Sequence, residues 1–338
     1  MSPNRRGILA AGLWLIDVTK HIDHYPAPSR LARVQQVVLS NGGGPFNLLV
    51  DLARLGAPFP LRAAGRIGED AQGDWILGHC RKHGIMTEQL GRVPGQPTAC
   101  TDVMTETGSG RRTFFYLAGA NESFGADNLD LAASDARVLY LGYPGLLPGI
   151  DQVKGGRSGL EEILAAGRAS GHTTAVDLVT AEGPHWSTVR TALPLIDLLF
   201  VNEWEAARLL GHEVPPDESV GADVLVDMAR VLLERGVGEA VIAHAATGAV
   251  CVPRQGEALT LGAVDVPPAE IRGACGAGDA LAAGFLLGWH EARPWADCLH
   301  LGVAAAGTCL HHLTSSEGVR PWRECLEYSR QRGHRRFT

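Results

Sequence analysis

The sequence predicts an α/β fold with a mostly parallel central sheet and a small additional β-sheet that forms a lid. Three observations lead to this prediction. Apolar runs of strand length alternate with longer stretches of helical period. Several of those longer stretches are followed by glycine, which commonly ends a helix. Two further segments have β character without helical period. Strands that alternate with helices are typical of βαβ units, which build parallel sheets.

The strands expected in the main sheet are short runs rich in branched apolar residues. The first, Ile8–Ile16, follows Arg5 and Arg6 and ends before Asp17. This order imitates a secretion signal, but no small-residue cleavage site follows, so we expect a buried strand. The other strands are expected at Leu61–Ile67, Ala136–Leu141, Thr173–Leu178, Asp197–Val201 and Glu239–Ala245.

The expected helices carry apolar residues three and four positions apart. In Phe46–Leu55, the residues Phe46, Leu49 and Leu52 fall on one face, and Gly56 ends the pattern. The other helices are expected at Ala71–His83, Leu160–Ser170, Glu203–Leu210, Val224–Arg235, Ala277–His290 and Trp295–His312.

The two segments without helical period are Arg30–Ser40 and Thr98–Leu117. The second is expected to be a hairpin that turns at Gly108-Ser109-Gly110. We expect residues 17–41 and 98–120 to form a lid, and residues 1–16, 42–97 and 121–338 to form the core. An ordinary extension of the main sheet is the alternative interpretation.

Composition and charge narrow the class of protein. Apolar residues make up 45% of the chain and charged residues 20%, which is ordinary for a soluble globular protein. With a net charge of -7 and no long basic run, we expect no nucleic acid as partner. No apolar stretch reaches the ~18 residues that a membrane span needs, so we expect no membrane as partner either. Arg330, Arg332, Arg335 and Arg336 are expected to lie in a frayed terminus. Seven cysteines without a CxxC pair predict a reducing, cytoplasmic location.

The strongest local signal is Gly276-Ala277-Gly278-Asp279, which opens a predicted helix. Backbone N–H groups at a helix N-terminus have no partner in the helix and carry partial positive charge. Small side chains allow a phosphate to approach these groups closely. Asp279 beside them could accept a proton from a hydroxyl that attacks phosphorus. A glycine-rich helix start with a favourable acidic residue is the alternative.

Three further strings lie near the ends of predicted strands. Asn41-Gly42-Gly43-Gly44-Pro45-Phe46-Asn47 is a glycine turn that enters a helix, and it matches neither a P-loop nor GxGxxG. Asn202-Glu203-Trp204-Glu205 suits a hydrated Mg²⁺ near phosphates, although acidic helix starts are common. Gly65 to Gly73 is interpreted as architecture, with Asp70 capping a helix.

In this order and spacing, the four strings resemble the ribokinase-like (PfkB) carbohydrate kinase family, from Asp17 to about Pro321. The resemblance implies a ribokinase-like three-layer α/β/α sandwich with a mostly parallel central sheet and a small β-sheet lid that closes over a sugar. The residues that match the family pattern are Asp17, Gly42, Gly43, Asn47, Gly65, Gly68, Asp70, Gly73, Gly119, Ala120, Asn121, Asn202, Glu205 and Gly276 to Asp279.

The resemblance also implies an activity: ATP-dependent phosphorylation of a hydroxyl on a sugar or sugar-like molecule. Asp279 would be the general base, and the amides of Gly276, Ala277 and Gly278 would form an anion hole. Glu205 would hold Mg²⁺ through water. The residues implied to bind substrate are Asp17, Gly43, Asn47 and Phe115, and those implied to bind ATP are Asn202, Glu205, His244, Gly248, Gly276, Gly278 and Cys309.

Departures from the family pattern leave several points open. Gly273-Ala274-Cys275 stands where the family usually has Asp-Thr-x, which argues against activation by K⁺. Gly44-Pro45-Phe46 replaces the Lys-Gly-Ala of ribokinase and argues against ribose. Arg111 and Arg112 could meet an anionic substrate or belong to a solvated turn. The resemblance further implies a homodimer formed through the lid.

Alternative functions also remain. A nucleoside kinase of the same fold would need an aromatic base pocket, which we expect near Trp14, Phe46 and Phe115. A catalytically silent sugar-binding regulator would not need an intact Asp279. A Rossmann-type dehydrogenase is disfavoured, because GxGxxG is absent after the first strand.

Overall fold

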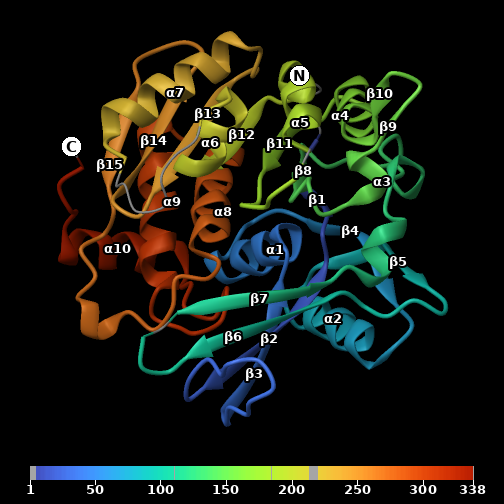
Figure 1. Cartoon of the computed structure of the whole chain (residues 1–338). Coiled ribbons are helices and arrows are strands. Elements are labelled where there is room, and N and C mark those ends of the chain that lie inside the picture. The colour runs from blue at the N-terminus through green and yellow to red at the C-terminus, as the bar shows by residue number, and fades with distance from the viewer. Residues whose placement is uncertain (1–4, 110, 184, 213–219, 338) are drawn as a thin grey trace.

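The computed structural model describes residues 5–109, 111–183, 185–212 and 220–337. Across these residues the main sheet has nine strands (Figure 1). Neighbouring strands from β5 through to β13 pair in parallel, and β14 and β15 are antiparallel to their neighbours. The order across the sheet is β15 (Leu259–Gly262), β14 (Gly248–Pro253), β13 (Ala240–Ala245), β12 (Leu198–Asn202), β11 (Thr173–Asp177), β8 (Val138–Gly142), β1 (Ile8–Gly12), β4 (Leu61–Gly68) and β5 (Met86–Val93).

Helices cover both faces of this sheet, because alternate residues of each strand point to opposite faces. In β1, Ile8 and Ala10 belong to one buried cluster, whereas Leu9 and Ala11 belong to another. The first cluster packs on α1 (Gly44–Leu55), α2 (Ala71–Lys82), α8 (Ala277–His290), α9 (Trp295–Cys309) and α10 (Trp322–Arg332). The second packs on α3 (Pro148–Asp151), α4 (Gly159–Ala169), α5 (His185–Ala192), α6 (Glu203–Leu210) and α7 (Ala222–Glu234). The predicted three-layer sandwich is confirmed.

The small separate sheet is also confirmed and lies below the sandwich in Figure 1. Its order is β3 (Val34–Gly42), β2 (Leu15–Ile22), β6 (Cys100–Glu106) and β7 (Arg112–Leu117). β6 and β7 form the expected antiparallel hairpin. Gly110 of the predicted turn lies outside the described residues. Below, this sheet is called the lid.

The prediction of one strand over Ile8–Ile16 is wrong, because that run supplies strands to two sheets. β1 ends at Gly12, whose φ of +125° is a conformation that other residues rarely adopt. A Cβ there would lie 2.3 Å from the carbonyl oxygen of Gly142. Trp14 anchors the crossing, since its Nε1 donates to the Ala64 carbonyl at 2.8 Å. β2 then starts at Leu15 and carries Asp17 into the lid.

The buried Asn121 holds the same crossing from the other side. Its Nδ2 donates to the Trp14 carbonyl at 2.8 Å, and its Oδ1 accepts from the Trp14 amide at 3.3 Å. Both backbone groups of Trp14, which lies between two strands of different sheets, are therefore satisfied by one side chain. Asn121 is thus a structural member of the matched pattern.

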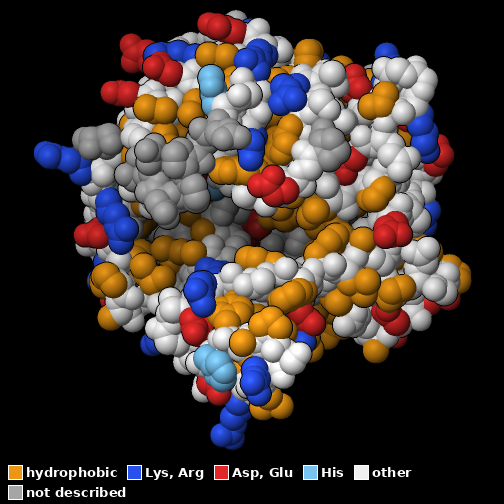
Figure 2. All heavy atoms as spheres, in the orientation of Figure 1, with side chains coloured by type: hydrophobic (Ala, Val, Ile, Leu, Met, Phe, Trp, Pro, Cys, Tyr) orange, Lys and Arg blue, Asp and Glu red, His pale blue; other side chains and the backbone are white. Residues whose placement is uncertain are grey.

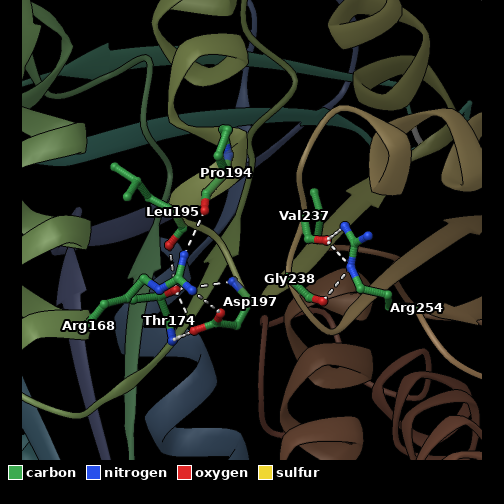
Figure 3. Close-up of polar contacts among 8 residues, drawn as sticks. All are labelled: Arg168, Thr174, Pro194, Leu195, Asp197, Val237, Gly238 and Arg254. Atoms are coloured by element: carbon green, nitrogen blue, oxygen red, sulfur yellow. Dashed lines mark hydrogen bonds and ion pairs between the residues drawn. The ribbon is translucent and has the colours of Figure 1, made fainter.

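Arginine contacts close the amino-terminal edge of the main sheet (Figure 3). Arg168 donates to the Pro194 carbonyl at 2.6 Å and lies 3.6 Å from an Asp197 carboxyl oxygen. Asp197 also accepts from the Thr174 amide at 2.9 Å. Arg254 donates to the carbonyls of Val237 and Gly238. These contacts stabilise the end of the sheet at which the parallel strands begin. A ligand site is expected at the opposite end, beyond the carboxyl ends of the strands.

The prediction of a frayed C-terminus is wrong as far as Phe337. His334 bridges to Val264, and the Arg335 amide donates to the Ala263 carbonyl at 2.8 Å. Arg332 binds Glu270 through two contacts of 2.7 and 2.8 Å. Among the described helices, none combines the length and apolar character needed to cross a membrane.

Candidate active site

The N-terminus of α8 forms a compact group of backbone donors. Gly276 precedes the helix with a φ of +78°, and a Cβ there would lie 2.3 Å from the Ser315 carbonyl oxygen. Glycine is therefore required at this turn. The helix then begins with Ala277, Gly278 and Asp279, whose N–H groups have no acceptor within the helix. Small residues leave these amides accessible to an anion.

Asp279 lies in this first turn and is 3% exposed. Its Oδ2 accepts from Asn47 Nδ2 at 2.9 Å. Its two carboxyl oxygens also lie 2.9 and 3.0 Å from the donating hydroxyl of Tyr143. Two side chains from distant parts of the chain thus orient one buried carboxyl group.

Tyr143 reaches Asp279 from a strained backbone position. Its φ is +67°, which is uncommon for a residue other than glycine. Its ring packs over Gly44, where a Cβ would lie 2.8 Å from the ring. We did not predict Tyr143 as a site residue. The available signal was its position directly after the predicted strand Ala136–Leu141, where ligands bind in such sheets.

Several acidic groups face the same space as Asp279. Burial raises the pKa of Asp279 to about 6, and the hydrogen bonds from Asn47 and Tyr143 lower it. Burial and the neighbouring charge of Asp279 together raise the pKa of Asp17 to about 7. Burial raises the pKa of Asp177 as well, with a further contribution from Asp279. The site is therefore acidic, and the two donors favour ionisation of Asp279.

A cavity of about 490 Å³, here called the lid cavity, lies over these groups between the sandwich and the lid. Figure 2 shows the hollow on this face, with hydrophobic side chains along its rim. The described lining contains no Lys or Arg. Its polar side includes Asp17, Asn47, Asp177 and Asp279, and its apolar side is formed by Leu13, Leu15, Phe114, Tyr116, Leu146, Leu178 and Val179.

A second cavity of about 450 Å³ lies beside the β13–β14 hairpin and is here called the hairpin cavity. Its described walls are mostly apolar, which suits a flat aromatic group. They come from the hairpin, the segment after β15, and α9: Ala245, Gly248, Ala249, Ala263, Val264, Val303, Ala306, Gly307 and Leu310.

The two cavities meet at the start of α8. A Cβ on Gly278 would lie 3.2 Å from His244 Nε2, so the imidazole stands directly beside the first turn of the helix. Burial lowers the pKa of His244 to about 4, which keeps the ring neutral. The residues that line both cavities are Asn202, His244, Ala274, Ala277 and Gly278. A ligand in one cavity can therefore contact a ligand in the other across this helix start.

Asn202 and Glu205 form a capping box at the start of α6. Asn202 Oδ1 accepts from the Glu205 amide at 2.8 Å, and Glu205 Oε2 accepts from the Asn202 amide at 2.9 Å. Glu205 Oε1 accepts from Thr180 at 2.9 Å. Burial raises the pKa of Glu205 to about 7. The same motif starts the helix and places a carboxyl group on the lid cavity.

This geometry agrees with a comparison of the whole chain with protein families. The sequence profile of the pfkB family carbohydrate kinases matches residues 8–321. The chain belongs to the pfkB family. It is thus an ATP-dependent kinase with a sugar-like acceptor.

Individual members of the pfkB family are distant in sequence. The ribokinase of Haemophilus influenzae is 23% identical over 329 residues, which cover 96% of this chain and 98% of that protein. Two solved structures share the fold, each covering 96% of this chain. The ribokinase of Arabidopsis thaliana complexed with ribose and ATP has a TM-score of 0.78, 21% identity and 99% coverage of its own chain. The nucleoside kinase of Methanocaldococcus jannaschii has a TM-score of 0.74, 17% identity and 98% coverage of its own chain.

Most residues that the pfkB resemblance singled out lie together in this structure. Gly248 lines the hairpin cavity. The others line the lid cavity: Asp17, Gly43, Asn47, Asn202, Glu205, His244, Gly276, Ala277, Gly278 and Asp279.

The expected position of Phe115 in the substrate pocket is corrected. Phe114 and Tyr116 line the lid cavity, whereas Phe115 points to the outer face of β7 and is 59% exposed. Successive side chains along a strand point to opposite faces of the sheet. An expectation that is wrong by one residue therefore places the side chain on the wrong face. Trp14 and Phe46 do not form an aromatic base pocket either, since they stack in the core with ring centroids 4.9 Å apart.

Cys309, which was expected to bind ATP, is also absent from the described lining of the hairpin cavity. It is buried at the last position of α9, and its Sγ donates to the Ser315 carbonyl at 3.2 Å. Its neighbours Ala306, Gly307 and Leu310 line the hairpin cavity instead. The predicted helix to His312 is three residues too long, because α9 ends at Cys309.

Arg111 belongs to the turn end of the lid. It lies 3.8 Å from Glu106, and its guanidinium stands 5.0 Å above the ring of Tyr25. This position fits the interpretation of a solvated turn.

Proposed function

We propose that the chain transfers the γ-phosphoryl group of ATP to a hydroxyl of a small molecule bound in the lid cavity. The observation that carries the proposal is that both cavities meet at the first turn of α8, where Asp279 lines the lid cavity. The acceptor oxygen forms a bond to the γ-phosphorus while the bond to the β–γ bridging oxygen breaks, and ADP leaves. The acceptor proton moves to the carboxylate of Asp279.

The surroundings of Asp279 support its role as general base. Asn47 and Tyr143 engage the carboxylate from two directions and hold it ionised in a buried site. The amides of Gly276 and Gly278 are available for the negative charge of the transferring group, whereas the Ala277 amide donates to the Ala274 carbonyl at 3.4 Å. Closure of the lid over the cavity would exclude water, which otherwise competes as acceptor.

Asn202 and Glu205 fit a hydrated Mg²⁺. Glu205 is a buried carboxylate on the lid cavity, and it retains lone pairs beyond the two contacts it accepts. We propose that the two residues hold the ion through its waters. The ion supplies positive charge that neutralises the phosphates of the nucleotide.

The lining of the lid cavity favours an uncharged acceptor. Asp17, Asp177 and Asp279 would repel a sugar acid or a sugar phosphate. The described lining contains no Lys or Arg, although the charge of Arg112 acts on Cys275 in that lining and offsets part of the repulsion. The polar side suits the hydroxyls of a sugar. The apolar wall around Leu146 and Leu178 also suits a nucleobase, so a nucleoside is the second candidate acceptor.

A panel of sugars, sugar acids and nucleosides, assayed for ADP release and product phosphate, tests this proposal. We expect turnover with one or more uncharged acceptors and none with sugar acids. Asp279→Asn should bind ADP normally and lose about 10²–10⁴-fold in kcat. A variant that keeps more than about a tenth of wild-type turnover would remove Asp279 from the base role. A wild-type protein that binds sugar without consuming ATP would instead support the silent regulator.

We also propose that the lid pairs with the lid of a second copy. The outer face of the lid carries four strongly exposed apolar side chains: Val37 at 57%, Leu39 at 52%, Phe115 at 59% and Leu117 at 48%. Leu39 and Phe115 lie in one row across the four strands, with Val18 and Asp102 between them. An apolar sheet face of this kind favours burial against an identical one. The free state of all seven cysteines supports a cytoplasmic location.

A further inference from the structure

Residues His334 to Phe337, near the C-terminus, form a segment that we call the tail. It leaves α10 and returns to the edge of the main sheet beside β15 (Figure 1). The Arg335 amide donates to the Ala263 carbonyl at 2.8 Å, and His334 Nδ1 lies 2.8 Å from the Gly262 carbonyl. His334 also bridges to Val264 in antiparallel fashion. Ala263 and Val264 line the hairpin cavity, so the tail supports one of its walls.

Two glycines leave room for this docking. A Cβ on Gly262 would lie 1.9 Å from the Arg335 carbonyl oxygen, and a Cβ on Gly248 would lie 2.6 Å from the ring of Phe337. Contacts below 3.0 Å are incompatible with a side chain unless the tail moves. Because Gly248 itself lines the hairpin cavity, the tail packs directly behind residues that face the cavity.

The tail also contributes charge to the cavity. Arg335 belongs to the described lining of the hairpin cavity, and no other Lys or Arg occurs in the described lining of either cavity. The neighbouring lid cavity carries several carboxyl groups, including Asp177 and Asp279. A nucleoside triphosphate is strongly anionic, so its binding beside these carboxyls calls for a compensating cation.

The guanidinium of Arg335 is free to change partners. Its Nε lies 3.3 Å from Asp265, and it donates to the Val266 carbonyl at 3.1 Å. The side chains of Arg335 and Asp265 are 40% and 64% exposed. An ion pair this exposed contributes little, so exchanging it for a bound anion costs little. A phosphate accepts from a guanidinium through two parallel hydrogen bonds.

We infer that the tail is part of the nucleotide site and that Arg335 donates hydrogen bonds to the bound nucleoside di- or triphosphate. The inference rests on the proposed function, in which the hairpin cavity holds ATP. It adds a binding residue from the C-terminus that the matched pattern, which ends at residue 321, does not contain.

The test measures ADP binding by calorimetry together with steady-state kinetics. Arg335→Ala should weaken ADP binding about tenfold and raise the KM for ATP by a similar factor. The KM for the acceptor and kcat should stay within about threefold of wild type. Arg332→Ala is the matched control, because Arg332 pairs with Glu270 and lies outside the described cavity lining. Asp265→Asn frees the guanidinium, so ADP binding should stay equal or become tighter.

Gly262→Ala provides a second route to the same result, because its Cβ displaces the tail without altering Arg335. We expect it to weaken ADP binding as Arg335→Ala does, with a thermal melting curve that confirms folding. An ADP dissociation constant within about twofold of wild type in both variants overturns the inference. A wild-type protein that does not bind ADP contradicts the proposed function itself, so the two failures are distinguishable.

Discussion

The hydroxyl of Tyr143 provides the sharpest test of the proposed chemistry. Tyr143→Phe deletes one oxygen that lies 2.9 and 3.0 Å from the two carboxyl oxygens of Asp279. A hydrogen bond to a charged group contributes about 1.5–3 kcal/mol, and about 1.4 kcal/mol corresponds to one pKa unit. Since the hydroxyl stabilises the ionised form, its loss should raise the pKa of Asp279 by about 1–2 units from about 6.

The sign of the effect follows from the role of a base. Protonated Asp279 cannot take the proton of the substrate hydroxyl. The value of kcat/KM therefore falls as pH drops through the pKa of Asp279. The variant should lose about 5- to 50-fold in kcat/KM at pH 6 and approach wild type near pH 9. Other groups whose charges act on Asp279, or are acted on by it, remain in place: Asp17, Asp51, Tyr140, Asp177, Glu205, Cys275 and Cys309.

Tyr140→Phe is the matched control, because it removes a buried phenol that donates to Asp177 at 2.8 Å instead of Asp279. Its pH profile of kcat/KM should keep the acid limb of the wild type. The reasoning is refuted if Tyr143→Phe reduces kcat equally at every pH while the acid limb stays in place.

Three further predictions concern stability and assembly. Asp51 is fully buried, and hydrogen bonding with Ser316 offsets only part of the cost of burying its carboxyl group. Burial raises its pKa, so the folded state holds a proton that the unfolded state releases above pH 4, and stability falls as pH rises from there. Asp51→Asn should therefore increase the free energy of unfolding in urea by about 2 kcal/mol at pH 8 and by less at pH 5; equal effects at both values contradict this. Asn121→Ala removes both contacts to the backbone of Trp14 and should cost about 2–3 kcal/mol in the same assay, and a cost under about 0.5 kcal/mol would contradict the anchoring role. Leu39→Asp should convert a dimer to a monomer in analytical ultracentrifugation, whereas an unchanged mass rules out pairing through the outer face of the lid.

Local patterns in the sequence were sufficient for the central elements of the sandwich. Period-two and helical patterns mark strands and helices, and glycines such as Gly56 and Gly211 end helices in the left-handed conformation. The edge strands β5 and β15 were not predicted, because one face of each meets solvent and their apolar pattern is weak. β14 and α10 were also missed.

Part of the candidate site could also be predicted from short patterns in the sequence. The glycines before Asp279 and the Asn202–Glu205 motif act within one turn of helix, so the sequence alone identifies the helix starts they make. Asn47 was found through the family pattern, and the structure brings its amide to Asp279 from 232 positions away in the chain.

Tertiary structure decided what no local pattern contains. The pairing register of the lid turns Phe114 and Tyr116 inward and Phe115 outward, and that register depends on strands far apart in the chain. Tyr143 meets Asp279 across 136 residues, and Arg335 reaches the hairpin cavity only because the tail folds back on Ala263. A sequence determines which short segments can form helices and strands, because those patterns repeat within a few residues. Which side chains meet depends on packing between segments, since only the assembled layers bring their surfaces together.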